Sequence, residues 1–136
     1  MTMNKPETFA IADRFFSAIE KGDIDSVEAL YADDLVVWHS NRPLDERSSG
    51  QSKSENLQLL RHVCDFIDGI HYEILDRQLT ETGFVQQHIF RGRSKTGHEV
   101  ALPVAIIFVI KAGKIVRIDE YMDPAKFPTK NAGVIE

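Results

Sequence analysis

The sequence predicts a single α+β domain, in which helices from the first half of the chain pack on an antiparallel sheet from the second half. In the first half, apolar residues recur at intervals of three and four, which is the period of an amphipathic helix. In the second half, strand-like runs are separated by short links that contain glycine. A chain of 136 residues, 43% of them hydrophobic, is sufficient for one domain with its own core.

Two helices are expected before residue 35. The first ends at Gly22, because glycine commonly follows the last turn of a helix, and Asp23 can cap a second, short helix. Residues 35–39 follow as the first strand. The apolar stripes consist of Phe9, Ala12, Phe15, Phe16 and Ile19 in the first helix and of Ile24, Val27, Leu30 and Tyr31 in the second.

A polar loop and a third helix come next. Residues 41–54 contain many Ser, Asp and Arg residues and few large apolar ones, so we expect a mobile loop that is a candidate lid for a pocket. Ser52 and Glu55 fit a capping box at the start of the third helix, and Gly69 is expected to end it. The buried stripe of this helix consists of Leu57, Leu60, Val63, Cys64 and Ile67.

Four more strands are expected in the second half, and their short links make neighbouring strands antiparallel. Residues 100–110 are almost continuously apolar, which indicates that helices cover one face of that strand and a partner subunit the other. Pro103 within it indicates a bulge or an edge. The domain spans residues 1–136, and residues 126–136 form its tail. The expected strands are residues 71–79, 84–93, 99–110 and 114–122.

Composition and motifs exclude several classes of function. The net charge is −5, with no basic run, which argues against binding to nucleic acid or to an anionic membrane surface. No signal peptide or membrane span is visible, and the single cysteine, Cys64, cannot form an intramolecular disulfide, so we expect a cytoplasmic protein. There is no Gly-x-Ser-x-Gly nucleophile elbow and no glycine-rich nucleotide loop, and we expect no cofactor.

Two parts of the sequence resemble a known superfamily. Residues 21–34 (Lys-Gly-Asp-Ile to Tyr-Ala-Asp-Asp), followed by Val-Val-Trp-His at 36–39, are similar to the opening of SnoaL-like and ketosteroid isomerase-like proteins of the nuclear transport factor 2-like superfamily. Residues 101–104 (Ala-Leu-Pro-Val) and 113–124 (Gly-Lys-Ile-Val to Glu-Tyr-Met-Asp-Pro) resemble the last two strands of that superfamily. Together these parts span nearly the whole chain.

The resemblance implies a cystatin-like α+β barrel, in which a strongly curved antiparallel sheet forms a cone around the long N-terminal helix. A ligand cavity would open at the wide end of the cone, and homodimers would pack through the sheet. Trp38 and Tyr121 are then expected in the core or in the dimer interface. Since a fold does not determine a function, the catalytic positions of the superfamily decide what chemistry is implied.

Ketosteroid isomerase-like chemistry requires a helical tyrosine, a carboxylate base and a protonated aspartate. The matching positions hold Phe15, His39 and Ala105, so the donors that stabilise an oxyanion are missing. His39 remains a candidate base, because an imidazole titrates near neutral pH.

Two other members of the superfamily imply a different set. Limonene epoxide hydrolase-like proteins use an Asp-Arg-Asp relay, of which Glu120 keeps one acid, while the other two positions fall within a residue or two of Gln86 and His88. SnoaL-like polyketide cyclases pair a histidine with an acid, and His88 and Glu120 are the matching residues. Such a pair can move a proton next to a carbonyl if one pKa lies near the working pH.

Strand alternation independently places these residues together. Side chains two apart share a face, so Glu120 shares one with Ile118 and Met122, and His88 shares one with Gln86. The result is an apolar pocket with a few polar groups, which is typical of small-molecule sites. The expected lining consists of Phe15, Val37, His39, Gln86, His88, Phe90, Ala105, Ile107, Ile118, Glu120 and Met122.

We therefore expect an isomerase, cyclase or hydrolase that acts on a small apolar carbonyl or epoxide compound. Glu120 and His88 would exchange the proton, with His39 assisting and Gln86 orienting the substrate. The three acid/base residues lie on separate strands without ligand spacing, so no metal is expected. Each also has a structural reading, as a strand-end or core histidine or a solvated carboxylate. The alternative function is a non-catalytic domain that binds a hydrophobic ligand or dimerises.

Overall fold

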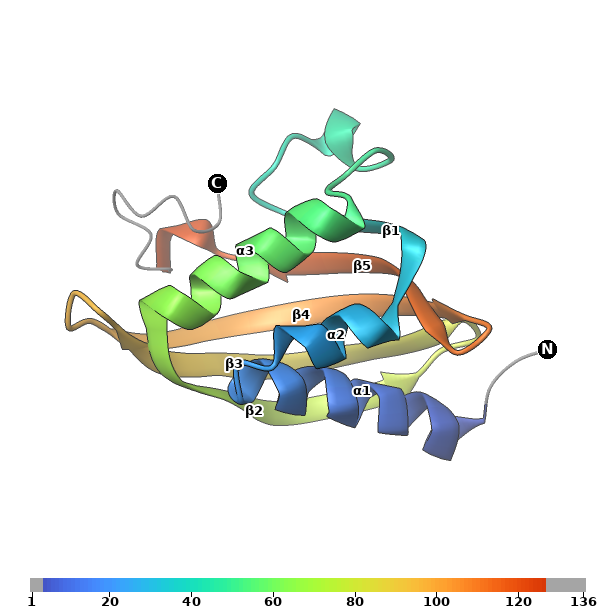
Figure 1. The fold of residues 1–136 in the computed structure, drawn as a ribbon, viewed down its shortest axis with the longest axis horizontal. Helices are drawn as coiled ribbons and strands as arrows, with labels where there is room; N and C mark the ends of the chain where they lie inside the picture. The colour runs from blue at the N-terminus through green and yellow to red at the C-terminus, as the bar shows by residue number, and fades with distance from the viewer. Residues whose placement is uncertain (1–3, 127–136) are drawn as a thin grey trace.

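Three helices cover one face of a five-stranded sheet in the computed structural model, which describes residues 4–126 (Figure 1). Of the expected tail, the part after Lys126 lies outside the described residues. The elements are α1 (Lys5–Glu20), α2 (Ile24–Leu30), β1 (Tyr31–His39), η1 (Leu44–Glu46), α3 (Lys53–Phe66), β2 (Ile67–Leu79), β3 (Gly83–Ser94), β4 (Glu99–Lys111), β5 (Lys114–Met122) and η2 (Pro124–Lys126).

The sheet is mixed, with the strand order β1-β5-β4-β3-β2. The pairs β2–β3, β3–β4 and β4–β5 are antiparallel, which confirms the expectation from their short links. β1 instead runs parallel to β5. These two strands are far apart in the chain, so no hairpin fixes their relative direction.

The helix caps follow the sequence in most places. Asp23 accepts a hydrogen bond from the Ser26 backbone, and Ser52 with Glu55 forms the expected capping box. The expected end of α3 at Gly69 is wrong, because the helix ends at Phe66. Gly69, with φ 65°, lies in β2, where the register with β3 shifts between residues 68 and 71. The glycine therefore permits a bulge and not a helix cap.

Aromatic side chains fill the core between the helices and the sheet. The rings of Phe84 and Phe108 stack with centroids 4.5 Å apart, and Phe15 of α1 meets the Phe108 ring edge-on at 5.0 Å. All three are at most 4% exposed. This packing fixes α1 against the inner face of the sheet, the face toward the helices.

β4 shows which of its residues face inward. Its inner side chains are buried, whereas Ala101, Pro103 and Ile107 on the other face are exposed. Among residues 4–126, these outer side chains of β4 are left uncovered, so only the inner half of the expected two-sided burial is observed. Pro103 makes no bulge toward β3, and the ladder with β5 begins only at Val104, so Pro103 lies at a local edge of β4.

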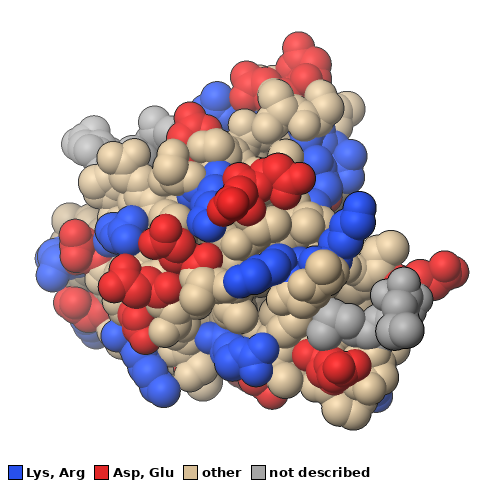
Figure 2. Space-filling model, turned by 45° about the vertical axis from the view of Figure 1, so that its right-hand side comes forward, with Lys and Arg blue, Asp and Glu red and all other residues tan. Residues whose placement is uncertain are grey.

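The charged surface matches the composition. On the face shown in Figure 2, acidic and basic side chains are interspersed without a large region of one sign. Among residues 4–126, no helix is both long and apolar enough to cross a membrane.

Candidate functional site

One row of paired residues crosses the inner face of the sheet and carries most of the candidate site. His39 pairs with Glu120, Glu120 with Ile106, and Ile106 with Gln86. Paired residues lie side by side on one face, so all of them point toward the helices. His88 lies in the next row. The inner face thus brings together eight of the expected strand residues: Val37, His39, Gln86, His88, Phe90, Ile118, Glu120 and Met122.

The expected inward positions of Ala105 and Ile107 are wrong. Ala105 pairs with Tyr121, Ile107 pairs with Asp119, and Ile107 is 38% exposed on the outer face. Their sequence neighbours Val104 and Ile106 are the buried residues. Because the whole run is apolar, its sequence shows no polar–apolar alternation, and so does not indicate which alternate residues face inward.

Glu120 and His39 form an ion-pair contact at the centre of the site. His39 Nε2 lies 3.1 Å from Glu120 Oε1, and their side chains are 11% and 22% exposed. Burial acts to raise the pKa of the Glu120 carboxyl, but the hydrogen bond and charge of His39, with a further contribution from His88, outweigh it and hold that pKa below its ordinary value. Glu120 is therefore an anion at neutral pH, and His39 Nε2 must carry the shared proton.

His88 is buried, with an exposed fraction of only 1%. Burial lowers the pKa of its imidazole to about 4, a shift that Glu120 opposes and Arg77 reinforces, so the ring is neutral at pH 7. Its Nδ1 lies 2.8 Å from Gln86 Nε2. Its Nε2 is buried and has no hydrogen-bond partner within the described chain.

Gln86 is fully buried, and the protein uses both ends of its amide. Its Oε1 accepts a hydrogen bond from Arg77 Nε at 2.7 Å, and its Nε2 contacts His88. Arg77 also donates to Asp13 of α1 at 2.7 Å. These contacts position His88.

Sequence reasoning missed Tyr72 and Tyr31 as members of the site. The Tyr72 ring lies 5.0 Å from the His88 ring, and burial, with Glu120 nearby, raises its pKa well above the ordinary value. The Tyr31 hydroxyl donates to Asn56 Oδ1 at 2.6 Å, and burial likewise raises its pKa. Both hydroxyls therefore stay protonated. Their only sequence signals were the helical stripe for Tyr31 and the strand alternation for Tyr72.

A cavity of about 230 Å³ adjoins His39. It lies between β1, the segment 40–51 and the first half of α3, and of the expected pocket residues Val37 and His39 line it. Its volume falls just below the roughly 300–1,000 Å³ usual for ligand pockets, which suits a small molecule. The full lining is Val37, Trp38, His39, Arg42, Glu46, Gly50, Gln51, Glu55 and Leu59.

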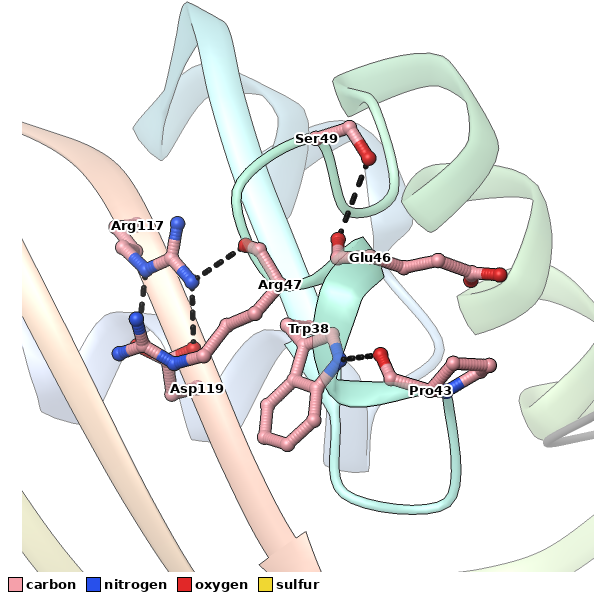
Figure 3. Close-up of polar contacts among 7 residues, drawn as sticks. All are labelled: Trp38, Pro43, Glu46, Arg47, Ser49, Arg117 and Asp119. Atoms are coloured by element: carbon pink, nitrogen blue, oxygen red, sulfur yellow. Dashed lines mark hydrogen bonds and ion pairs between the residues drawn. The ribbon is translucent and has the colours of Figure 1, made fainter.

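The segment expected to be a mobile lid is tied to the outer face of the sheet (Figure 3). Asp119, 4% exposed, accepts two hydrogen bonds from Arg117 and one from Arg47 of the loop. Arg117 also donates to the Arg47 carbonyl, and the Trp38 indole donates to the Pro43 carbonyl. The loop is thus held across the edge of β1, where it closes the cavity beside His39.

The sequence matches the SnoaL-like domain family over residues 12–118. The chain belongs to the SnoaL-like family. No curated protein is significantly similar to it in sequence. Solved structures show the same fold at low identity, and their coverage extends over most of each chain.

Three such structures illustrate the range of the fold. An LEH-like epoxide hydrolase from M. tuberculosis is 19% identical, with a TM-score of 0.72 over 89% of this chain and 86% of that chain. A putative SnoaL-like polyketide cyclase from Jannaschia sp. CCS1 is 11% identical, with a TM-score of 0.76 over 95% of each chain. A ketosteroid isomerase-like protein from Catenulispora acidiphila, in complex with trimethylamine, is 13% identical, with a TM-score of 0.70 over 85% of this chain and 87% of that one.

This SnoaL-like domain does not gather a metal site in the part described. Among residues 4–126, no three His, Cys, Asp or Glu side chains converge as ligands, although His39 and Glu120 touch. The interior therefore contains one carboxylate bonded to one imidazole, and a second imidazole bonded to an amide.

We expect Asp119→Asn to destabilise the domain, because it removes the charge that holds two guanidinium groups on the outer face. Hydrogen bonds to charged groups contribute about 1.5–3 kcal/mol, and the half-exposed Arg47 places the loss near the lower end of that range. Urea denaturation measures it. Asp33→Asn is the matched control, since the fully exposed Asp33 pairs with Lys53. Equal losses in both variants would show that the outer cluster does not hold the loop.

His88 should make the domain less stable in acid. Its pKa is about 4 in the folded chain, against 6.5 ordinarily, so the unfolded chain binds the proton first as the pH falls below 6.5. Between pH 7 and pH 4.5 this difference lowers the free energy of unfolding by about 2 kcal/mol. Denaturation at both pH values should show that extra loss in the wild type but not in His88→Gln, with the exposed His98→Gln as control. An identical pH dependence in all three proteins would contradict a neutral, buried His88.

Proposed function

We propose that this SnoaL-like domain is an acid/base enzyme that acts on a small, largely apolar carbonyl compound, with Glu120 as the base. The observation that carries the proposal is the 3.1 Å contact of Glu120 with His39 on the apolar inner face of the sheet. A carboxylate mostly withdrawn from water, yet kept ionised by one imidazole, is available to accept a proton. Among the similar structures, proteins described as an epoxide hydrolase and a putative polyketide cyclase support a small-molecule enzyme.

The proposed reaction begins at a carbon next to the carbonyl. Glu120 takes the proton from that carbon, the C–H electron pair moves into the carbonyl group, and the carbonyl oxygen becomes an enolate oxygen. Where a neighbouring double bond extends the enolate, it recovers the proton from Glu120 at the far carbon of that double bond, which completes an isomerisation. Alternatively, the enolate carbon attacks a second carbonyl within the molecule, which closes a ring, and the alkoxide that forms takes the proton from Glu120. His39 Nε2–H holds the carboxylate in place throughout.

The test compares wild type and Glu120→Gln in thermal-shift screens against small ketones, lactones and epoxides, with mass spectrometry to detect turnover. General base catalysis contributes about 10²–10⁴-fold, so the Gln variant should bind a hit and convert it at least 100-fold more slowly. Glu46→Gln is the control, because Glu46 lines the cavity beside His39 and pairs with Arg42 instead of with a histidine.

Two outcomes would count against the proposal. Unchanged turnover in Glu120→Gln would remove Glu120 from the chemistry. Tight binding without turnover in any of the three proteins would favour the alternative function, a domain that binds a hydrophobic ligand.

We also propose a homodimer that covers the outer face of the sheet. That face presents Ala101, Pro103 and Ile107, with Tyr121 alongside at 41% exposure. Contiguous exposed apolar side chains on a folded domain commonly mark an interface between proteins. Trp38 lies buried beside Tyr121, with ring centroids 5.7 Å apart, and so supports this face from within the chain.

Ile107→Lys should convert the dimer to a monomer, because it places a charge at the centre of the outer face. Size-exclusion chromatography with light scattering measures the mass. Leu44→Lys is the control, since Leu44 is 74% exposed but belongs to the loop and not to the sheet. A wild-type protein that is already monomeric at high concentration, or an Ile107→Lys protein that stays dimeric, would exclude this interface.

A further inference from the structure

The proposed enolate leaves one requirement unmet, since its oxygen needs a hydrogen-bond donor. In the proposed reaction, Glu120 and His39 act on the proton that leaves the carbon and not on the enolate oxygen. Within the described chain, His88 Nε2 is a buried ring nitrogen without a partner, on a side chain 1% exposed on the same inner face. An unsatisfied polar atom in an interior is costly and calls for an explanation, and a ligand is one.

We propose that Arg77 and Gln86 fix His88 in its neutral, Nε2-protonated form, so that His88 donates a hydrogen bond to an acceptor oxygen of the ligand. The tautomer of His88 depends only on side chains of this chain. The hydrogen bond from His88 to a ligand rests on the proposed function, because it places the substrate between His88 and Glu120.

The hydrogen bonds decide where the His88 proton lies. A guanidinium group has donors only, so the Gln86 atom 2.7 Å from Arg77 Nε must be the amide oxygen. The amide nitrogen then points at His88 Nδ1, 2.8 Å away, and donates to it. A ring nitrogen that accepts a hydrogen bond carries no proton. The single proton of the neutral ring is therefore on Nε2.

The groups around His88 keep the ring uncharged. Among residues 4–126, the anion that acts on it is Glu120 of β5 and the cation is Arg77 of β2. The rings of Tyr72 and Phe16 pack against it edge-on at 5.0 and 5.5 Å. Desolvation by these rings, together with the Arg77 charge, outweighs the attraction of Glu120. A neutral donor can polarise a carbonyl oxygen without giving up its proton.

Arg77 is itself held in place from two elements. Asp13 of α1 accepts its Nη1 hydrogen bond at 2.7 Å. Its guanidinium carbon lies 5.3 Å from the centroid of the Phe9 ring and 5.7 Å from that of the Phe84 ring, within the range of cation–π attraction. A buried donor with a fixed support needs no reorganisation when a ligand arrives.

The proposed ligand would lie between the donor and the base. His88 is on β3 and Glu120 on β5, separated by β4, so their backbones are two strand spacings, or roughly 10 Å, apart. Both side chains lie on the inner face of the sheet. The arrangement selects molecules with an acceptor oxygen a few atoms from an acidic C–H, which describes a ketone or a lactone. It discriminates against hydrocarbons, which have no acceptor.

The first experiment determines the His88 tautomer by NMR of protein with 15N-labelled histidine. In the wild type between pH 6 and 8, the proton should be found on Nε2. In Gln86→Glu the new carboxylate can only accept, so the proton should appear on Nδ1. Arg91→Met is the control, because Arg91 pairs with Glu73 across the same two strands but is half-exposed, and it should leave His88 unchanged. Protonation on Nδ1 in the wild type would overturn the proposal without any variant.

The second experiment tests the hydrogen bond from His88 to a ligand with two probes of nearly equal shape, cyclohexanone and methylenecyclohexane. Cyclohexanone should shift the His88 Nε2 signal, and its Kd should weaken about tenfold in His88→Phe, as expected for the loss of one buried hydrogen bond. Methylenecyclohexane should bind both proteins alike. Equal binding of both probes to both proteins would show that His88 does not reach the ligand. The tautomer result stands apart from turnover, so failure here is distinguishable from failure of Glu120 as the base.

Discussion

The parallel pairing of β1 with β5 is the constraint on which the candidate site depends. It places His39 directly beside Glu120, although the two residues are far apart in the chain. Ser40 fixes the end of this pairing, because its backbone donates to the Glu120 carbonyl and its hydroxyl bonds both the nitrogen and the oxygen of Met122. Without this alignment the Glu120 carboxylate would lose its hydrogen bond with His39 in an apolar interior, at a cost that favours the neutral acid.

Consecutive acids on β5 have opposite tasks because successive side chains alternate between the faces of the sheet. Asp119 points outward and holds the loop through Arg47 and Arg117, while Glu120 points inward to His39. A slip of one residue would exchange their environments and leave both carboxylates without their partners. The two pairs therefore specify the register of β5 and connect the closed loop to the geometry of the interior.

The sequence indicated much of this arrangement, for identifiable reasons. Strand alternation placed Glu120, His88 and His39 on one face, and each does share the inner face. Alternation failed on β4, where a continuously apolar run conceals its parity, so Ala105 and Ile107 were expected inside and lie outside. Strand alternation also could not predict the contact between Asp119 and the loop, because it joins residues 72 apart and depends on the tertiary fold. An acid next to a candidate base gives no sign of which face it occupies until the register is known.

Arg77 shows most clearly why the interior could not be completed from the sequence. Tyr72 pairs with Phe90 and Arg77 with Gln86, so both face inward, yet they are five residues apart, an odd interval that strict alternation assigns to opposite faces. A register shift between Ile74 and Asp76 adds one residue to β2 and returns Arg77 to the inner face. This bulge brings the guanidinium to the Gln86 amide and so orients His88. His88 and Glu120, the proposed donor and base, then lie on opposite sides of β4, and the orientation of His88 follows from one extra residue in an edge strand.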